Sequence, residues 1–267
     1  MPKIIAIINQ KGGVGKTTTV INLAAGLSLL GKKTLIIDLD PQGNSTSGLG
    51  LDKNEIQLST YDLLIGSHQL NSIIKKIDLE DNRSIYISPS TEQLSGADIE
   101  LYDEDRREFR LKDQLNNEEI NNFDYALIDC PPSLSLLSIN ALSASDSLLV
   151  PIQCEFFAME GLAQLNKTIN LVKERINNNI SIEGFLLTMF DSRNNICKTV
   201  VNEVKNYFGN NVLKTIIPKN VKLAECPSFG KCIFEYDKYC LGAKSYMELT
   251  KEILMKNGDQ YIEKIIR

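Results

Sequence analysis

The sequence contains no apolar run as long as the ~18 residues that a membrane-spanning helix needs. The apolar run near the N-terminus is short, and Gln10-Lys11 follow it where a signal peptide would have its small-residue cleavage site. With one histidine, His68, and no Cys-x-x-Cys pair, a zinc site would need at least three thiolates. We therefore expect a cytoplasmic protein whose six cysteines are reduced and structural. They are Cys130, Cys154, Cys197, Cys226, Cys232 and Cys240.

Length and composition are typical of a globular protein. The chain has 267 residues, of which 43% are hydrophobic and 24% charged, and this excludes a collagen-like, coiled-coil or wholly disordered chain. No Pro/Gly/Ser-rich linker and no internal repeat divides it. We therefore predict a single domain over residues 1–267.

Apolar runs bounded by polar or turn residues alternate with helical patterns, which predicts a parallel sheet covered by helices on both faces. The predicted strands are Lys3–Asn9, Lys33–Asp38, Arg83–Ser88, Tyr125–Asp129, Ser147–Pro151 and Ile182–Met189. The predicted helices are Thr17–Leu30, Leu134–Ala144, Gly161–Ile176 and Lys198–Phe208. The expected fold class is α/β, with a doubly wound, mainly parallel sheet.

Two stretches interrupt this alternation. Pro41–Ser59 is rich in Gly, Ser and Asn, which predicts a long functional loop. Asp98–Glu119 mixes acids and arginines, which predicts an exposed, solvated helix.

Charge is distributed unevenly along the chain. The net charge is −5, but residues 193–267 hold 13 Lys and Arg against 8 Asp and Glu, and residues 1–192 hold 16 against 26. An acidic body with a basic last quarter is compatible with a local polyanion-binding face and equally with ordinary solvated surface.

The strongest motif lies where the first predicted strand ends and the first helix begins. Glycines there allow positive φ and turn backbone N–H groups inward around an anion, and the helix adds the positive end of its dipole. Lys16 is suited to bridging β- and γ-phosphate oxygens, and the Thr17 hydroxyl to binding Mg²⁺ directly. The predicted phosphate-binding residues are Gly12, Gly13, Val14, Gly15, Lys16, Thr17 and Thr18.

This motif departs from the ordinary phosphate loop at its start. Gln10 stands where the first glycine is expected, and a second lysine, Lys11, precedes Gly12. One lysine suffices for a phosphate within the same chain. The spacing alone leaves two interpretations of Lys11 open: a solvated surface residue, or a residue that reaches a nucleotide in a partner subunit.

Several motifs in order resemble one family over nearly the whole chain. Lys11–Thr18 resembles the deviant Walker motif of the MinD/ParA class of P-loop ATPases, Leu35–Asn44 resembles its D-x-D-P-Q-x-N signature, and Tyr125–Pro132 resembles its Walker B strand. Similarity continues at Pro151–Gly161 and Ile217–Glu225. Within the class, the sequence is most similar to the short ParA/Soj chromosome-partition ATPases.

Chemistry and resemblance together assign roles to three acids. Asp38, Asp40 and Asp129 fall at or just beyond strand C-termini, the edge where open α/β sheets bind ligands. We expect Asp129 and Asp38 to hold Mg²⁺ through water, and Asp40 to orient or activate the attacking water. Simple strand-end solvation is the alternative for Asp38.

The resemblance further implies an ATP-dependent homodimer. In it, Lys11 would contact the phosphates of the opposing subunit's ATP and act with Lys16 and Asp40 in hydrolysis of ATP to ADP and phosphate. Pro218 and Asn220 are similar to the family's adenine contacts. A ParB/Spo0J-type centromere-binding protein would stimulate hydrolysis, and the chain would be associated with the nucleoid in segregation of a chromosome or plasmid.

The resemblance also implies non-specific binding of double-stranded DNA. Family arginines match Arg193, Lys219 and Lys222, and here two of the three are lysines, which suit backbone phosphates as point charges. Lys198 belongs to the same basic region. No sequence-specific DNA module precedes the phosphate loop, so we expect no operator recognition.

Other members of the same superfamily give the competing hypotheses. A MinD-like membrane-surface ATPase would need a basic amphipathic C-terminal helix. Met247–Met255 shows helical periodicity, but Lys256–Asp259 interrupts it, which favours a helix packed on the core. An iron–sulfur ATPase would need paired cysteines, whereas Cys226 and Cys232 are six apart without the motif. A bacterial tyrosine kinase would need a C-terminal tyrosine cluster, where only Tyr261 stands.

Overall fold

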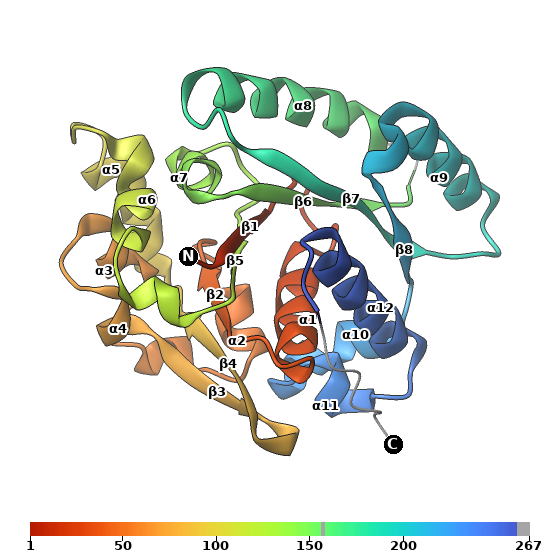
Figure 1. Ribbon diagram of the computed structural model, residues 1–267, viewed down its shortest axis with the longest axis horizontal. Coiled ribbons are helices and arrows are strands. Elements are labelled where there is room, and N and C mark those ends of the chain that lie inside the picture. Colours follow the sequence, from red (N-terminus) through yellow and green to blue (C-terminus); the bar gives the residue numbers. More distant parts are fainter. Residues whose placement is uncertain (156–157, 261–267) are drawn as a thin grey trace.

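A computed structural model describes residues 1–155 and 158–260, with the backbone alone for residues 158–166 (Figure 1). Phe156 and Phe157 of the Pro151–Gly161 motif, and the C-terminal Tyr261, lie outside the described residues. Eight strands of the described chain form one sheet in the order β3-β4-β2-β5-β1-β6-β7-β8. They are β1 Lys3–Ile7, β2 Thr34–Asp38, β3 Lys75–Leu79, β4 Arg83–Ser88, β5 Tyr125–Asp129, β6 Ser147–Gln153, β7 Ser181–Phe190 and β8 Val212–Pro218.

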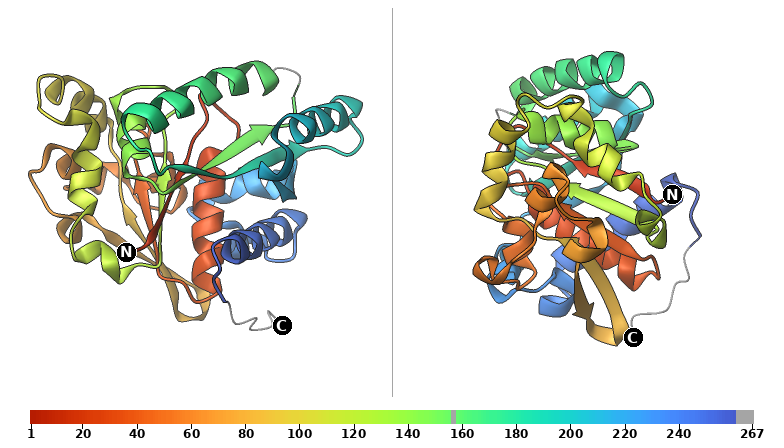
Figure 2. Two further views of the ribbon diagram at one scale, coloured as in Figure 1. Left: turned by 45° about the horizontal axis from the view of Figure 1, so that its top comes forward. Right: turned by 90° about the vertical axis from the view of Figure 1, so that its left-hand side faces the viewer.

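All neighbouring strands run parallel except β3 and β4, which are antiparallel. Helices cover both faces of the sheet (Figures 1 and 2). They are α1 Lys16–Leu29, α2 Asn44–Gly48, α3 Thr60–Ile65, α4 Leu70–Ile73, α5 Ala97–Glu100, α6 Arg110–Leu115, α7 Leu136–Ala144, α8 Ala158–Arg175, α9 Asn195–Phe208, α10 Val221–Glu225, α11 Ile233–Asp237 and α12 Leu241–Lys256. The predicted doubly wound, mainly parallel fold is therefore confirmed.

The sheet separates two hydrophobic clusters. On β2, Leu35 and Ile37 face the cluster that α3–α9 cover, while Ile36 faces the cluster under α1 and α10–α12. Side chains alternate between the faces of a strand, so a strand buried on both sides must be apolar at every position. This requirement explains why continuous apolar runs in the sequence predict the central strands.

The C-terminal amphipathic pattern belongs to the second cluster. Met247, Ile253 and Leu254 of α12 are buried beside α1, as predicted for a helix packed on the core. No helix of the described residues combines the length and apolar character needed to cross a membrane.

The prediction of one exposed helix over Asp98–Glu119 is wrong. Only α5 and α6 in this segment are α-helical, with 3-10 turns at Arg107–Phe109 and Glu119–Asn122. Arg106 adopts φ +57°, which a right-handed helix cannot contain. Beyond it, Leu111 and Leu115 enter the core, so the segment packs on the domain and is not a solvated helix.

Two strands were not predicted, and both have exposed polar positions. Lys75 and Lys76 of β3 are exposed at the edge of the sheet, and Lys214 interrupts the apolar run of β8.

The predicted loop Pro41–Ser59 contains α2 and a 3-10 turn at Lys53–Glu55. Further 3-10 turns are Glu80–Asn82, Glu92–Gly96, Gly209–Asn211 and Cys226–Phe229. The six cysteines are free, and Cys240 alone of them is partly exposed.

Candidate active site

The predicted phosphate loop connects the end of β1 to the start of α1. Gly13 and Gly15 adopt φ +74° and +89°, a region that favours glycine. A Cβ atom added to Gly12 or Gly13 would meet nothing within 4 Å, so open space lies against the loop. Because α1 starts at Lys16 and runs for 14 residues, its unpaired N–H groups face the same region. The loop therefore has the form of an anion cradle.

Lys16 closes over this cradle. Its ammonium donates to the carbonyl of Lys11 over 3.2 Å, and the residue is 7% exposed. Burial lowers the pKa of Lys16, an effect that Asp129, Cys130 and Asp40 partly offset. A desolvated ammonium on a backbone carbonyl is suited to exchange that contact for phosphate oxygens.

Asp38 and Asp129 lie side by side at the carboxyl ends of β2 and β5. Asp129 accepts a hydrogen bond from Ser45 Oγ over 2.7 Å, and its other carboxylate oxygen is buried without a partner. Asp38 accepts the N–H and hydroxyl of Thr46 over 2.9 and 2.7 Å. Burial, followed by repulsion from Asp129, raises the pKa of Asp38. Burial also raises the pKa of Asp129, although the nearby hydroxyl groups of Ser45 and Thr17 oppose the rise.

Asp40 stands two residues beyond the end of β2 and is 7% exposed. Its carboxylate accepts the N–H of Gln42 over 3.0 Å, and its carbonyl accepts the Ser90 hydroxyl over 2.7 Å. These contacts fix Asp40 near Asp129. The negative charge of the Asp40 carboxylate raises the pKa of Asp129. The structure thus gathers Lys16, Thr17 and all three predicted acids into one site.

Hydroxyl side chains that sequence reasoning missed complete this site. Ser45, Thr46 and Ser90 are fully buried and bind the acids or their backbone. Ser45 and Thr46 directly follow the D-x-D-P-Q-x-N signature, so their position was a usable signal. Ser90 carried none, because its contact with Asp40 spans 50 residues.

A cavity of about 330 Å³ adjoins the phosphate loop, and its lining is mainly apolar. It brings Pro218 and Asn220, the predicted adenine contacts, together with Gly15 and Thr18. Asn220 Oδ1 accepts the N–H of Lys222 as the N-cap of α10, which leaves its amide NH₂ as a donor. The other lining residues are Thr188, Met189, Ile217, Lys219, Val221, Leu223, Ala224 and Tyr246.

Comparisons with known proteins agree with this geometry. Residues 2–182 match a family described as an AAA domain. The sporulation initiation inhibitor protein Soj of Bacillus subtilis is 51% identical over 253 residues, which cover 95% of this chain and 98% of that protein. The chromosome-partitioning ATPase Soj of Treponema pallidum is 46% identical, covering 97% of this chain and all of that one. The chain belongs to the Soj/ParA family of chromosome-partitioning ATPases.

A solved structure extends the agreement to ligands. Cobyrinic acid a,c-diamide synthase from Mycobacterium smegmatis, with bound ADP and magnesium, is 32% identical with a TM-score of 0.84, and the match covers 98% of each chain. The Soj/ParA family assignment and this similarity support nucleotide binding with Mg²⁺ and ATP hydrolysis in general terms.

Lys11, the second lysine of the motif, pairs with an acid that follows β6. Lys11 Nζ lies 3.3 Å from Glu155 Oε2, and the Lys11 side chain is 39% exposed. Its N–H donates to Asn9 Oδ1, and Asn9 in turn donates to the carbonyl of Pro151. The structure thus holds the backbone of Lys11 at the loop and presents its ammonium at the surface.

The predicted DNA-binding residues lie near the carboxyl ends of β7 and β8. Arg193, whose side chain is 88% exposed, pairs with Asp191 over 2.8 Å, and this pairing holds the pKa of Asp191 well below its usual range. Lys219 N donates to the carbonyl of Phe190, which brings its loop beside Asp191. Lys198 is exposed on α9.

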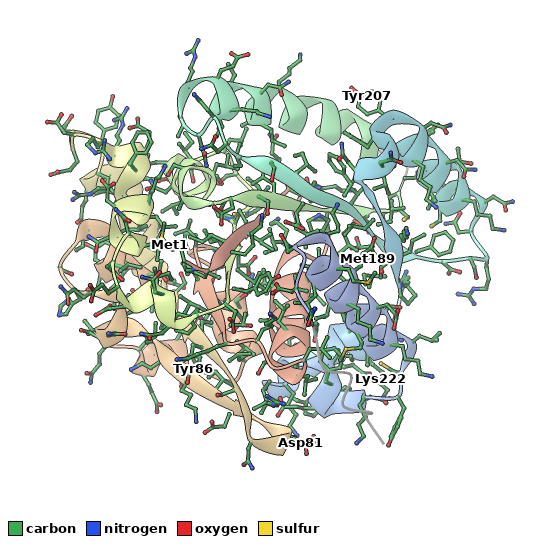
Figure 3. The ribbon with its side chains drawn as sticks, in the orientation of Figure 1. Met1, Asp81, Tyr86, Met189, Tyr207 and Lys222 are labelled. Atoms are coloured by element: carbon green, nitrogen blue, oxygen red, sulfur yellow. The ribbon has the colours of Figure 1, made fainter. Side chains whose placement is uncertain are left out.

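Lys222, labelled in Figure 3, lies on α10 below these loops. Its ammonium is 3.5 Å from Glu225 and 5.4 Å from the ring centre of Tyr236. Lys222 is therefore exposed, but with its charge partly matched by a local acid.

Proposed function

We propose that this chain is an ATP-dependent switch of chromosome or plasmid segregation, which dimerises with ATP and binds DNA without sequence preference. The observation that carries the proposal is that two lysines of the phosphate loop differ in burial and in their partners. Lys16 is buried over its own phosphate loop, whereas the Lys11 side chain of the same loop is 39% exposed and pairs with Glu155. Once it leaves Glu155, with which it pairs over 3.3 Å, this charge is available to a nucleotide bound by a second copy.

The acids at the site fit a magnesium ion. The unpartnered buried oxygen of Asp129 lies where a metal-bound water could donate, and Thr17 adds a hydroxyl beside it. We infer direct binding by Thr17 and water-mediated binding by Asp38 and Asp129. Mg²⁺ when bound neutralises charge on the β- and γ-phosphate oxygens.

Hydrolysis then depends on positioned charges. The phosphate-loop N–H groups and Lys16 hold the triphosphate, and Lys11 of the second copy adds positive charge where negative charge develops. Asp40 is placed to orient the attacking water, because Ser90 and Gln42 fix it beside the metal-binding acids. Pro218 and Asn220 contact the adenine.

DNA binding uses the basic last quarter of the chain. Arg193, Lys198, Lys219 and Lys222 are all exposed and suit backbone phosphates. A ParB/Spo0J-type partner with a basic N-terminal segment would find a complementary surface in residues 1–192, which carry 26 acids against 16 basic residues. Localisation on the nucleoid in the cytoplasm follows from DNA binding.

The decisive experiment measures binding to a random-sequence duplex with ATP, with ADP and without nucleotide, at two salt concentrations. We expect ATP-dependent binding that weakens with salt and is lost in a Lys219→Ala/Lys222→Ala variant. Lys75→Ala/Lys76→Ala is a matched control, since these exposed lysines lie on β3 at the opposite edge of the sheet.

A liposome-binding assay on the same protein distinguishes DNA binding from the alternative, binding to a membrane surface. ATP-dependent binding to anionic liposomes, with no DNA binding in any nucleotide state, would reject the segregation proposal in favour of a MinD-like positioning ATPase.

A further inference from the structure

One buried hydrogen bond joins the phosphate loop to the far strands of the sheet. Thr188, near the end of β7, is 2% exposed, and its hydroxyl donates to the carbonyl of Val14 over 2.9 Å. The two residues are 174 positions apart in sequence. Val14 is itself 1% exposed, so its carbonyl has little access to water as an alternative partner.

Thr188 also contacts the loop through its methyl group. A Cβ atom added to Gly15 would lie 4.0 Å from Thr188 Cγ2, and both residues line the same cavity, so the Thr188 methyl group lies close to the residue that precedes α1. The hydroxyl thus holds Val14, and the methyl lies close to the next loop residue, Gly15. These residues set the direction of the N–H groups that face the cradle.

The same residue forms part of the base-binding cavity. Thr188 and Met189 line it together with Pro218 and Asn220. Met189, labelled in Figure 3 near β8, adopts φ +53°, which is strained for a residue with a side chain. Strain of this kind persists only where the surroundings impose it, which marks the end of β7 as a shaped cavity wall.

Both neighbouring strands hold this wall in place. The carbonyl of Thr188 accepts the N–H of Cys154 at the end of β6, and the carbonyl of Phe190 accepts the N–H of Lys219 beyond β8. The wall cannot shift without moving Val14 as well, because Thr188 belongs to both.

We infer that Thr188 is a positioning residue that couples the base pocket to the phosphate loop. A base seated against Met189 and Pro218 adds a further constraint to the end of β7, and the hydrogen bond from the Thr188 hydroxyl extends that constraint to Val14 and the loop N–H groups. The base thereby strengthens binding of the phosphates. This inference rests on the proposed binding of ATP and adds a residue that no phosphate-loop motif contains.

The test combines a substitution with a truncated ligand. Thr188→Val keeps the side-chain shape and removes the hydroxyl, and inorganic tripolyphosphate keeps the phosphates and removes the base. Dissociation constants for ATP and for tripolyphosphate, each with Mg²⁺, are measured for wild type, Thr188→Val and Thr188→Ser. We expect the valine variant to bind ATP about tenfold more weakly and tripolyphosphate less than about threefold more weakly. Serine restores the hydroxyl and most of the affinity.

Ser28→Ala is the matched control. Ser28 also donates a buried hydroxyl to a distant backbone carbonyl, that of Ser84 at 2.9 Å, but at the other end of α1. It should change neither dissociation constant. Where the valine variant does not fold, Thr188→Ala removes the same hydroxyl and serves the same comparison.

The results distinguish the coupling role of Thr188 from the proposed ATPase function. Equal weakening of ATP and tripolyphosphate would overturn the coupling role of Thr188 and leave the ATPase proposal intact, because the bond would then merely support the loop. Wild-type protein that binds neither ligand would overturn the proposed function, and the inference with it.

Discussion

Asp38 and Asp129 face each other as paired residues of β2 and β5, both with no exposed surface. Hydroxyl groups of Thr46 and Ser45 bind them, and the ammonium of Lys16 is close enough to influence Asp129. Two like charges in a buried site cost folding free energy, which a bound metal ion would offset. The pair therefore lowers the stability of the ligand-free fold.

Asp38→Asn should stabilise the ligand-free protein. Burial and Asp129 raise the pKa of Asp38 above that of the unfolded chain, so wild type loses stability as pH rises above about 4. The asparagine cannot ionise. At pH 8 we expect a gain of about 1 kcal/mol or more, roughly 2–4 °C in Tm, which disappears towards pH 4. Thermal melts across this pH range test the sign, and a less stable variant at pH 8 would contradict it.

The sequence revealed those parts of the fold whose signal is local. Central strands such as β2 and β5 are apolar throughout, and the glycines of the phosphate loop mark positive φ where a strand meets a helix. By contrast, β3 begins with two exposed lysines, Lys75 and Lys76, and Leu79 is its one buried residue, so its pairing with β4 decides its structure more than its composition does.

The site was predictable only where its residues follow a motif. Lys16, Thr17 and the acids stand at strand ends within recognisable runs. Ser90 and Thr188 reach the site through the tertiary fold, the first from beyond β4 and the second from β7. No local pattern encodes a hydroxyl that bonds to a carbonyl 174 residues away.

Lys16→Ala and Lys11→Ala should separate binding from dimerisation. Removing the buried Lys16 ammonium should weaken ATP binding by at least tenfold, because the phosphate oxygens lose their charged donor. Lys11→Ala should retain the affinity of one chain for ATP and lose the ATP-dependent dimer. Fluorescent-nucleotide titration and sedimentation velocity measure the two effects. An ATP-dependent dimer of the Lys11 variant would remove that residue from the interface.

Asp40→Ala should keep ATP binding and abolish turnover. In the proposed mechanism its carboxylate orients the attacking water, a role typically worth a factor of about 100 to 10,000 in rate. We expect an ATP-bound dimer that persists on gel filtration while phosphate release falls by at least about 100-fold. Asp78→Ala, an exposed acid on β3, provides the control. Undiminished phosphate release in the Asp40 variant would exclude the role.

Asp191→Asn should tighten DNA binding. Asp191 holds the Arg193 guanidinium through two side-chain hydrogen bonds of 3.0 and 2.8 Å, so Arg193 must give up this carboxylate before it can bind a phosphate in the same way. Because Arg193 keeps the pKa of Asp191 far below its usual range, the carboxylate stays ionised at every pH where the protein is handled. The gain in affinity should therefore be equal at pH 6 and pH 8.

We expect a gain of about two- to fivefold at low salt, the scale of an exposed ion pair, with a steeper salt dependence because one more cation is free to displace counterions. A second substitution identifies the cause. In an Arg193→Ala background, Asp191→Asn should yield a markedly smaller gain, since the competing pair no longer exists and only the general loss of one negative charge remains. An equal gain in both backgrounds, measured by fluorescence anisotropy with ATP, would show that Asp191 repels DNA directly and that its pairing with Arg193 is irrelevant to affinity.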